Sequence, residues 1–219
     1  MRVLLTGAAG FIGGAIRTEL DGAGHELLLV DALIPQAHPP GATAADDVHL
    51  LDVRRAAEQD AWAELLSGVD VVCHQAAMVG AGVTAADLPL YAGHNDLGTA
   101  ALLAAMAATD VRRLVLASSM VVYGEGRYVC ADHGPQLPAV RPRSALESGR
   151  FECPCPVCGR DLDWALVPED APLDPRSSYA ASKVAQEHYA RAWARQADSA
   201  VVSLRYHNVY GPHMPRDTP

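Results

Sequence analysis

Residues 3–13 read VLLTGAAGFIG, and this stretch decides the fold. Its apolar start predicts a buried strand, its glycines predict a turn, and Ala15–Leu20 can open a helix. A second apolar run, Glu26–Val30, ends at Asp31, eighteen residues after the end of the glycine stretch. A strand, a glycine turn, a helix and a second strand in this order predict a βαβ unit that binds a dinucleotide.

The glycine turn has the chemistry that a pyrophosphate requires. Its glycines follow the spacing GxxGxxG and let the backbone approach a ligand, while the following helix start offers free N–H groups and a positive dipole end. Asp31 can accept hydrogen bonds from the adenosine ribose. Such glycine triplets also occur in ordinary turns and tight helix contacts, so the flanking strand, helix and acid support the interpretation. The residues expected at the cofactor here are Gly7, Gly10, Phe11, Ile12, Gly13 and Asp31.

Composition limits the classes of function. The 219 residues are enough for one large domain, or for one domain and part of a second. With 17 basic and 26 acidic residues the net charge is -9, which disfavours nucleic acid and anionic membranes as partners. The apolar start is too short for a signal peptide, and Leu97–Ala108 is too short to span a bilayer, so we expect a soluble cytoplasmic protein. Five cysteines, three of them within residues 153–158, suit reduced thiols or a metal better than disulfides.

Strand-like and helical stretches alternate along most of the chain. This alternation predicts an α/β fold with a doubly wound, Rossmann-like parallel sheet and helices on both faces. Residues 125–178, rich in Pro, Gly and Cys, break the alternation and are expected to be an insertion within an NAD-binding domain that spans 1–219. The further strands are expected at Val48–Leu51, Val69–Cys73, Arg112–Ala117 and Ala200–Arg205, and the further helices at Ala56–Leu66, Asn95–Ala108 and Tyr179–Gln196.

Candidate site residues follow several strands. Asp52 either accepts from the adenine amino group or caps the helix after it, and the two explanations are equally good. Ala76 and Ala77 are small enough for a flat cofactor to lie close to the strand end. His74 is either catalytic or structural, and we expect a hydrogen-bonded structural histidine.

Tyr179 and Lys183 are four residues apart, so on a helix they share one face. A nearby ammonium favours the phenolate, which makes Tyr179 a candidate general base. Ser119, at the end of a central strand, supplies a third polar group. The alternative explanation is that Tyr179 and Lys183 share this spacing by chance, on a partly exposed amphipathic helix without a catalytic role.

The combination TGxxGxxG, Asp31, Asp52, HQAA, Asn95, SSMVVYG, YAASK and RYHNVYGP, in this order, resembles the extended short-chain dehydrogenase/reductase family and, within it, the nucleotide-sugar epimerases and dehydratases. The resemblance implies NAD as cofactor, Ser119 and Tyr179 as catalytic hydroxyls, and Lys183 on the nicotinamide ribose. It adds Val53, Ala76, Ala77, Asn95, Ala117, Ser118 and Asn208 to the expected cofactor contacts. Ser119, Met120 and Asn208 are its expected substrate contacts.

The resemblance also implies a reaction. Tyr179 would take the proton from the sugar O4 while a hydride leaves C4 for NAD, and the 4-keto sugar would turn over before the hydride returns. Dehydratases of the family carry Thr-Asp-Glu where this chain has Ser119, Met120 and Val121, so an isomerase, an NDP-sugar 4-epimerase of deoxysugar biosynthesis, is favoured. The insertion looks most like the dTDP-L-rhamnose 4-epimerase type, which suggests a dTDP-6-deoxyhexose.

Two other functions remain open, an NAD(P)-dependent sugar ketoreductase and a non-catalytic NAD-binding regulator. Chains of this family continue beyond NVYGP into a C-terminal substrate domain, so that domain is expected to be largely missing from these 219 residues. The resemblance further implies a homodimer.

The insertion has the residues of a zinc site. Cys155 and Cys158 lie in CPVCG, which is typical of a zinc knuckle, and Cys130 and His133 form a C-x-x-H pair. Cys153 competes with His133 for the fourth place. A zinc ion with four protein ligands would be structural, and the alternative is a set of reduced thiols in a loop.

Overall fold

The computed structural model describes residues 1–82, 84–212 and 214. The chain forms two compact units. The first, here the sheet unit, comprises Met1–Val122 and Pro175–Pro219, and the second, the cysteine unit, comprises Tyr123–Asp174. The cysteine unit corresponds to the insertion expected at 125–178, with both borders shifted toward the N-terminus.

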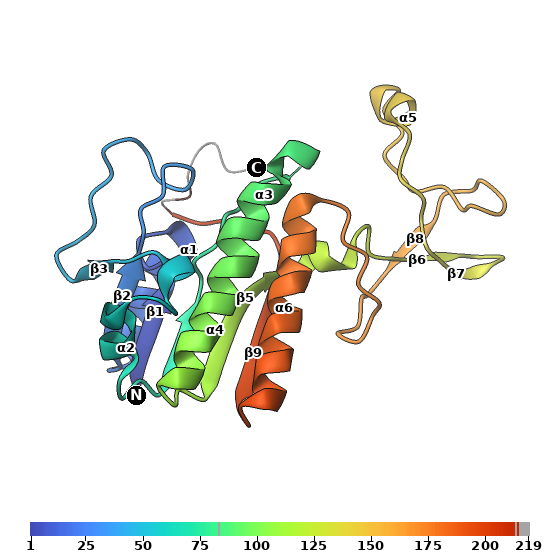
Figure 1. Ribbon diagram of the computed structural model, residues 1–219. Coiled ribbons are helices and arrows are strands. Elements are labelled where there is room, and N and C mark those ends of the chain that lie inside the picture. Colours follow the sequence, from blue (N-terminus) through green and yellow to red (C-terminus); the bar gives the residue numbers. More distant parts are fainter. Residues whose placement is uncertain (83, 213, 215–219) are drawn as a thin grey trace. The chain divides into compact units, whose positions relative to one another are not determined.

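Six parallel strands form the central sheet of the sheet unit (Figure 1), in the order β3-β2-β1-β4-β5-β9. This order confirms the predicted doubly wound sheet. Because the strand order reverses between β1 and β4, the carboxyl ends of these strands form the switch point where such sheets bind ligands. The strands are β1 (Arg2–Thr6), β2 (Glu26–Asp31), β3 (Val48–Leu50), β4 (Val71–His74), β5 (Arg113–Ser119) and β9 (Ala200–Tyr206).

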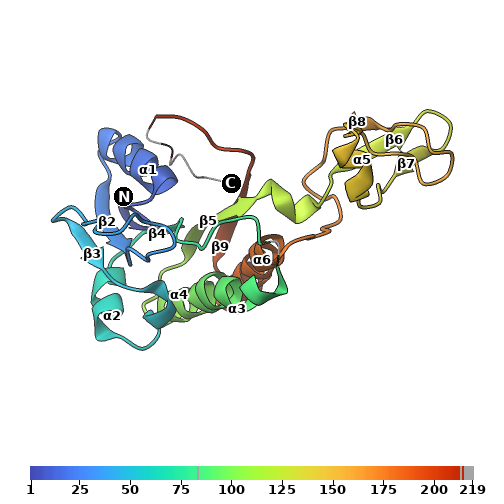
Figure 2. The ribbon, with the colours of Figure 1, turned by 90° about the horizontal axis from the view of Figure 1, so that it is seen from above.

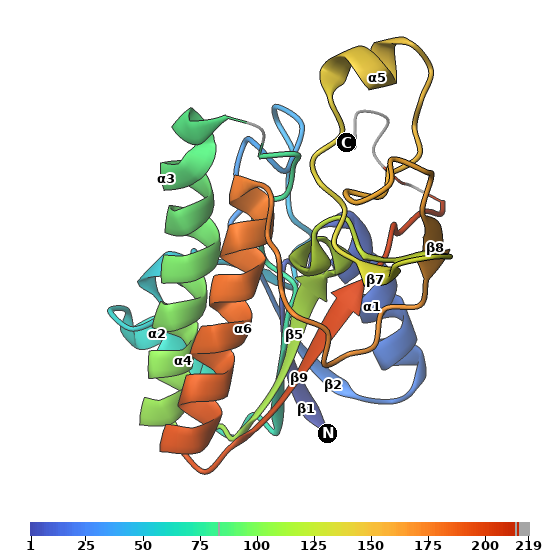
Figure 3. The ribbon, with the colours of Figure 1, turned by 90° about the vertical axis from the view of Figure 1, so that its right-hand side faces the viewer.

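Helices cover both faces of this sheet. Figure 2 shows α1 on one face and α2, α4 and α6 on the other, and Figure 3 shows the same division from the side. The α-helices are α1 (Phe11–Gly22), α2 (Asp60–Leu66), α3 (Leu88–Tyr91), α4 (Gly98–Ala108) and α6 (Ser178–Gln196). The 3₁₀ turns are η1 (Val53–Arg55), η2 (Ala85–Asp87) and η4 (Met120–Tyr123), and η3 (Ala92–Leu97) is a π-helical turn between α3 and α4.

Alternation along the strands divides the core into two layers. Leu4 packs in the larger layer with Trp62 of α2 and Leu102 of α4, whereas its neighbours Val3 and Leu5 pack in the smaller layer under α1. Successive strand side chains point to opposite faces, so one apolar run serves both layers. Each fully buried side chain of this size contributes roughly 1.5–3 kcal/mol through burial.

Three helices differ from the expected bounds. The first begins earlier than expected, at Phe11, directly after the glycine turn. The helix expected to open at Asn95 already begins at Leu88, with a proline in the first turn, where proline is tolerated. The helix expected over Ala56–Leu66 begins at Asp60, because the 3₁₀ turn η1 and a further turn precede it. Apolar periodicity marks the buried face of a helix and not its ends, which explains these differences.

The cysteine unit has a small antiparallel sheet of order β7-β6-β8. Its core consists of three buried cysteines and Leu162, with Tyr128 packed against them. So little apolar surface is insufficient to stabilise a fold of this length without a cross-link or a metal. Its elements are β6 (Arg127–Cys130), β7 (Gly134–Gln136), α5 (Arg143–Glu147) and β8 (Asp163–Ala165).

Among the described residues, none of the helices is both long and apolar enough to cross a membrane.

Candidate active site

The glycine turn packs more tightly than any side chain would allow. Gly7 has φ +70°, and a Cβ atom there would lie 2.7 Å from the backbone nitrogen of Ala76. A Cβ atom at Gly13 would lie 1.9 Å from the Gly7 carbonyl oxygen. These glycines therefore seat the first turn of α1 against β1 and the end of β4, in addition to leaving room for a ligand.

The start of α1 fits an anionic group. Gly10 is the N-cap, and in the described part of the chain no side chain caps this turn or places an acid in it. The main-chain N–H groups at Phe11 and Ile12 thus belong to a helix start with a positive dipole end. The donor set matches a pyrophosphate, as expected for NAD.

Asp31 ends β2 beside this turn and is 7% exposed. Its carboxylate accepts hydrogen bonds from the backbone N–H groups of Ala9 at 3.0 Å and Leu33 at 2.9 Å. Nε2 of His38 lies 3.3 Å from the same carboxylate. The acid is therefore next to the glycine turn, where a ribose acceptor is needed, and His38 is a neighbour that no sequence pattern indicated.

Asp52 has the geometry of a cap. Its carboxylate accepts the backbone N–H of Arg54 at 2.9 Å and pairs with the Arg54 guanidinium at 2.6 Å. Burial raises the pKa of Asp52, but the hydrogen bonds from Arg54 outweigh it and hold the pKa below its usual range. The capped element is the 3₁₀ turn η1 and not the long helix, and Val53 within it packs in the core. Contacts of these two residues with adenine remain a prediction.

His74 is held between two threonine hydroxyls. Nδ1 lies 2.7 Å from Oγ1 of Thr6, and Nε2 lies 3.1 Å from Oγ1 of Thr99. Burial, with a smaller effect from Lys183, lowers the pKa of His74 to about 3. The imidazole is therefore neutral and ties β1 and β4 to α4, as expected of a structural histidine.

Asn95 uses its whole amide within the protein. Oδ1 accepts the Met78 N–H at 2.7 Å, and Nδ2 donates to the Met78 carbonyl at 3.0 Å and to Oγ of Ser182 at 2.8 Å. The π-helical turn η3 aims this buried side chain at both partners. The Asn95 side chain thus joins the segment after β4 to α6. A cofactor that contacts Asn95, as predicted, would have to share its amide with Met78 and Ser182.

Ser119, Tyr179 and Lys183 lie together at the carboxyl end of β5. Ser177 caps α6 by accepting the Ala180 N–H at 3.1 Å, so the helix begins immediately before Tyr179. The side chain of Ser119 is close enough to Tyr179 to lower the pKa of its phenol. The Lys183 nitrogen lies 5.7 Å from the centre of the Tyr179 ring. The fold thus brings together all three predicted catalytic residues.

The ionisation of this group differs from the expectation. Burial raises the pKa of Tyr179, and the Ser119 side chain opposes this only partly. Burial lowers the pKa of Lys183 to about 7. The expectation that a charged lysine makes the phenolate favourable is therefore wrong for the free chain, because the amine is itself desolvated and partly neutral at pH 7.

The other residues predicted to contact cofactor or substrate differ in how deeply they are buried. Ala117 and Ser118 are buried at the end of β5, and Ala76 and Ala77 are half-buried after β4. Met120 is half-buried in η4, whereas Asn208 is exposed beyond the end of β9. Their contacts with cofactor or substrate remain predictions.

Sequence reasoning missed a buried ion pair in this region. Glu187 of α6 is fully buried and pairs with Arg205 of β9. The position of Glu187 four residues after Lys183, on the same helical face, is a signal for the burial of this carboxylate but not for its partner Arg205.

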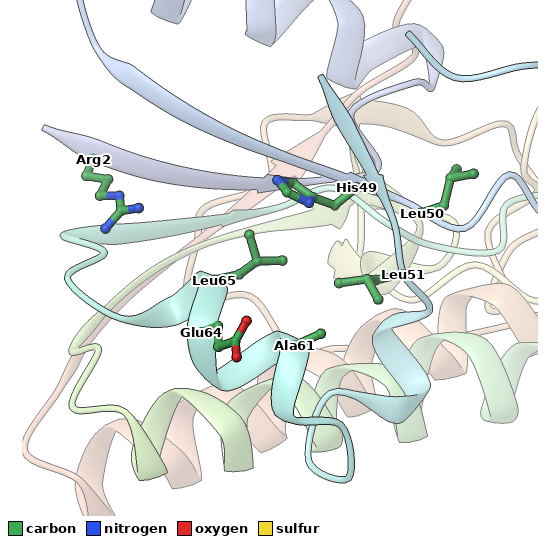
Figure 4. A pocket seen from close by; sticks show the side chains of 7 residues that line it. All are labelled: Arg2, His49, Leu50, Leu51, Ala61, Glu64 and Leu65. Atoms are coloured by element: carbon green, nitrogen blue, oxygen red, sulfur yellow. The ribbon is translucent and has the colours of Figure 1, made fainter. Parts of the chain in front are cut away.

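A hollow of the surface lies elsewhere, beside β3 and α2 (Figure 4). None of the predicted cofactor, catalytic or metal residues lines it. Its lining consists of Arg2, His49, Leu50, Leu51, Ala61, Glu64 and Leu65.

The cysteine unit gathers four potential metal ligands. The ligand atoms of Cys130, His133, Cys155 and Cys158 all lie within 4.8 Å of one another. Sγ of Cys130 lies 3.4 Å from Nδ1 of His133 and 3.8 Å from Sγ of Cys158. A tetrahedron with the usual Zn–S and Zn–N bonds has edges of roughly 3.5–3.8 Å, so these spacings fit zinc. Cys153 is buried next to this set but is not part of it.

Comparison with known proteins gives the family. Residues 3–145 and 160–219 match the NAD dependent epimerase/dehydratase family. The stretch between these segments, which holds Cys153, Cys155 and Cys158, lies outside the match.

Two relatives are named as epimerases. The dTDP-L-rhamnose 4-epimerase of Burkholderia thailandensis is 34% identical, over 96% of this chain and 58% of that protein. The UDP-glucose 4-epimerase of Streptomyces lividans is 29% identical, over 96% of this chain and 53% of that protein. The chain thus spans little more than half the length of these relatives.

Solved structures agree with the fold. The UDP-glucose 4-epimerase of Thermus thermophilus in complex with NAD has a TM-score of 0.72 and 31% identity, over 100% of this chain and 58% of that one. MoeE5 in complex with UDP-glucose and NAD has a TM-score of 0.69 and 28% identity, with the same coverage. These matches confirm the predicted resemblance, and the protein belongs to the NAD dependent epimerase/dehydratase family.

Proposed function

We propose that the protein is an NAD-dependent nucleotide-sugar 4-epimerase and that residues 1–219 form its NAD-binding domain, with 125–178 as an insertion. The observation that carries the proposal is the cluster of Ser119, Tyr179 and Lys183 at the carboxyl end of β5. The open helix start at α1 and the adjacent carboxylate of Asp31 support the cofactor.

Each residue of the cluster has a distinct task. NAD, when bound, supplies a hydride acceptor and donor for the sugar C4. Tyr179 accepts the proton of the sugar O4, and Ser119 shares its hydrogen bond with that oxygen and the phenol. Lys183 holds the nicotinamide ribose. Acceptance of that proton requires the phenolate, and because burial raises the pKa of Tyr179 in the ligand-free chain, the phenol must first lose its own proton to solvent.

The substrate proposed is a dTDP-6-deoxyhexose. Support comes from the name of the relative at 34% identity, a dTDP-L-rhamnose 4-epimerase. The positions Ser119, Met120 and Val121 contain no acid that could eliminate water from the sugar, which favours epimerisation over dehydration.

Turnover of a panel of dTDP- and UDP-sugars tests the proposal, in this chain and in a form with the full length of its relatives. Tyr179→Phe should reduce epimerisation on the order of 10² to 10⁴-fold, since it removes the general base. Ser119→Ala should reduce turnover with little effect on NAD binding. Tyr189→Phe, at an exposed tyrosine of the same helix, is the matched control. Unchanged turnover in Tyr179→Phe would refute the mechanism.

The same experiment separates an epimerase from a reductase. An epimerase regains its oxidised cofactor in every turnover and can retain it through purification. Product formation without added NADH or NADPH supports the epimerase, and strict dependence on a reduced cofactor contradicts it.

We also propose a structural zinc ion on Cys130, His133, Cys155 and Cys158. Four protein ligands leave no open position for a substrate, so the ion is assigned no chemistry. Its role is to order a unit whose core is mostly cysteine.

A homodimer is the third part of the proposal. Exposed apolar side chains at Leu88 and Leu97 on the outer helical layer support a protein contact there. Light scattering after size-exclusion chromatography tests it, and a monomer at high concentration would contradict it.

A further inference from the structure

We infer that Glu187 is a positioning residue for the cofactor site, one that sets the nicotinamide end of the site without touching the ligand. The inference rests on the proposed function, because it uses the assignment of Lys183 to the nicotinamide ribose. It concerns a group that the proposed mechanism leaves unused.

Glu187 makes a dense set of contacts for a fully buried carboxylate. Oε1 accepts the hydroxyl of Ser118 at 2.5 Å and Nε of Arg205 at 2.9 Å. Oε2 accepts Nη2 of Arg205 at 2.8 Å and, more weakly, Nη2 of Arg191 at 3.4 Å. The two bonds from Arg205 form a bidentate fork, which fixes orientation as well as distance.

These contacts tie α6 to two strands at one level of the sheet. Ser118 of β5 and Arg205 of β9 are directly opposite in the parallel register. Figure 3 shows α6 beside β5 and β9. Because Glu187 binds one residue of each strand, its carboxylate connects the helix to both. Burial raises the pKa of Glu187, but hydrogen bonds from Arg205 and Ser118 outweigh it, so the group is ionised.

Three consecutive residues of β5 thus meet one face of α6. The Ala117 carbonyl accepts a hydrogen bond from Lys183, the Ser118 hydroxyl donates one to Glu187, and the Ser119 side chain acts on the pKa of Tyr179. The middle contact, between Ser118 and Glu187, involves an ionised group that has no role in the proposed chemistry. Loosening it frees α6 to shift along β5, which moves Lys183 and Tyr179 relative to Ser119.

The adenosine end of the site lies on other elements. Asp31 ends β2 and the glycine turn joins β1 to α1, so neither depends on α6 for its position. Loss of the Glu187 contact should therefore lower the affinity for NAD, whose nicotinamide ribose reaches Lys183. The affinity for ADP, which lacks that ribose, should stay unchanged.

Calorimetric titration of the 219-residue chain with NAD and with ADP tests the inference. Glu187→Gln keeps the shape of the side chain but removes its charge, and NAD affinity should fall about tenfold while ADP affinity stays within about twofold. Arg205→Lys keeps a positive charge but loses the bidentate fork to Glu187, and it should shift the ratio of the two affinities in the same direction, by less. Arg195→Gln is the matched control, because Arg195 is an exposed arginine of the same helix outside the Glu187 contacts given above, and it should leave the ratio unchanged.

The outcomes separate the inference from the proposed function. If Lys183→Met changes the ratio of NAD to ADP affinity and Glu187→Gln does not, Glu187 is structural only and the inference is wrong. If NAD and ADP affinities fall together in Glu187→Gln, global loosening explains the result, and the inference is wrong as well. If Glu187→Gln does not fold, the ratio in Arg205→Lys decides by the same criterion. If Lys183→Met leaves the ratio unchanged, or the parent chain binds neither ligand, the proposed function fails and takes the inference with it.

Discussion

The side-chain nitrogen of Lys183 donates a 3.0 Å hydrogen bond to the carbonyl oxygen of Ala117, inside the sheet unit and with only 2% of the residue exposed. A neutral carbonyl does not compensate for the lost hydration of an ammonium group. Burial therefore lowers the pKa of Lys183 from 10.5 to about 7. The group predicted to hold the nicotinamide ribose thus titrates near physiological pH.

The pKa of Lys183 can be measured directly because it is the only lysine of the chain. Incorporation of lysine labelled with ¹³C at Cε gives one carbon signal in an NMR spectrum. We expect its titration midpoint near pH 7 in the folded chain and near 10.5 in urea. A folded-state midpoint above pH 10 would contradict the burial argument.

Replacement of Lys183 by methionine should stabilise the chain, and the gain should depend on pH. Between pH 7 and 10.5 the unfolded chain binds a proton at Lys183 that the folded chain does not, so the native free energy of unfolding rises with pH in this window. The gain in free energy of unfolding in Lys183→Met is therefore largest at pH 7 and below and disappears toward pH 10.5. Each unit by which burial lowers the pKa of Lys183 contributes about 1.4 kcal/mol to this gain. Urea unfolding at pH 6, 8 and 10 measures it, and a gain independent of pH would count against the prediction.

His74 should make the chain sensitive to mild acid. Its folded-state pKa of about 3 lies below the ordinary 6.5, so the unfolded chain takes up a proton first as the pH falls. The free energy of unfolding should decrease below pH 6.5 by up to about 1.4 kcal/mol per pH unit from this residue. His74→Gln should reduce that slope between pH 6.5 and 5, whereas His188→Gln, at an exposed position on α6, should not. Equal slopes in all three chains would show that another group is responsible.

Asp31 should select NAD over NADP. Its carboxylate is oriented by the Ala9 and Leu33 N–H groups, and a 2′-phosphate at the ribose would meet this negative charge. We expect at least about tenfold tighter binding of NAD in the native chain and a much smaller preference in Asp31→Ala. Asp46→Ala changes an exposed acid of the following loop and is the control. Similar binding of the two cofactors by the native chain would refute the assignment.

Zinc should be present at about one ion per chain when the protein is purified without chelator. Cys158→Ser removes one ligand of the tetrahedral set and should release the metal, whereas Cys153→Ser should retain it, since Cys153 lies outside that set. Both variants should still bind NAD, because the site has no role in the chemistry. Elemental analysis and titration with NAD provide the two measurements, and full zinc content in Cys158→Ser would overturn the ligand set.

Local patterns in the sequence were sufficient for the general fold and for part of the site. The doubly wound sheet follows from short apolar runs separated by helical stretches, because strand and helix periodicities are properties of neighbouring residues. The glycine turn is also local, since the position of Gly7 and Gly13 within one βαβ unit determines how α1 packs. Tyr179 and Lys183 were recognisable for the same reason, as they share one helical face at a spacing of four.

Only the tertiary structure decided what depends on distant segments. The Ser118–Glu187 hydrogen bond joins residues 69 apart in the sequence. No local pattern indicates that Arg205 lies opposite Ser118 in the sheet and pairs with Glu187. The choice of His133 over Cys153 as the fourth metal ligand likewise depends on how the cysteine unit folds. The ionisation of Tyr179 and Lys183 was misjudged from sequence because a pKa depends on desolvation, and burial is set by packing from several elements at once.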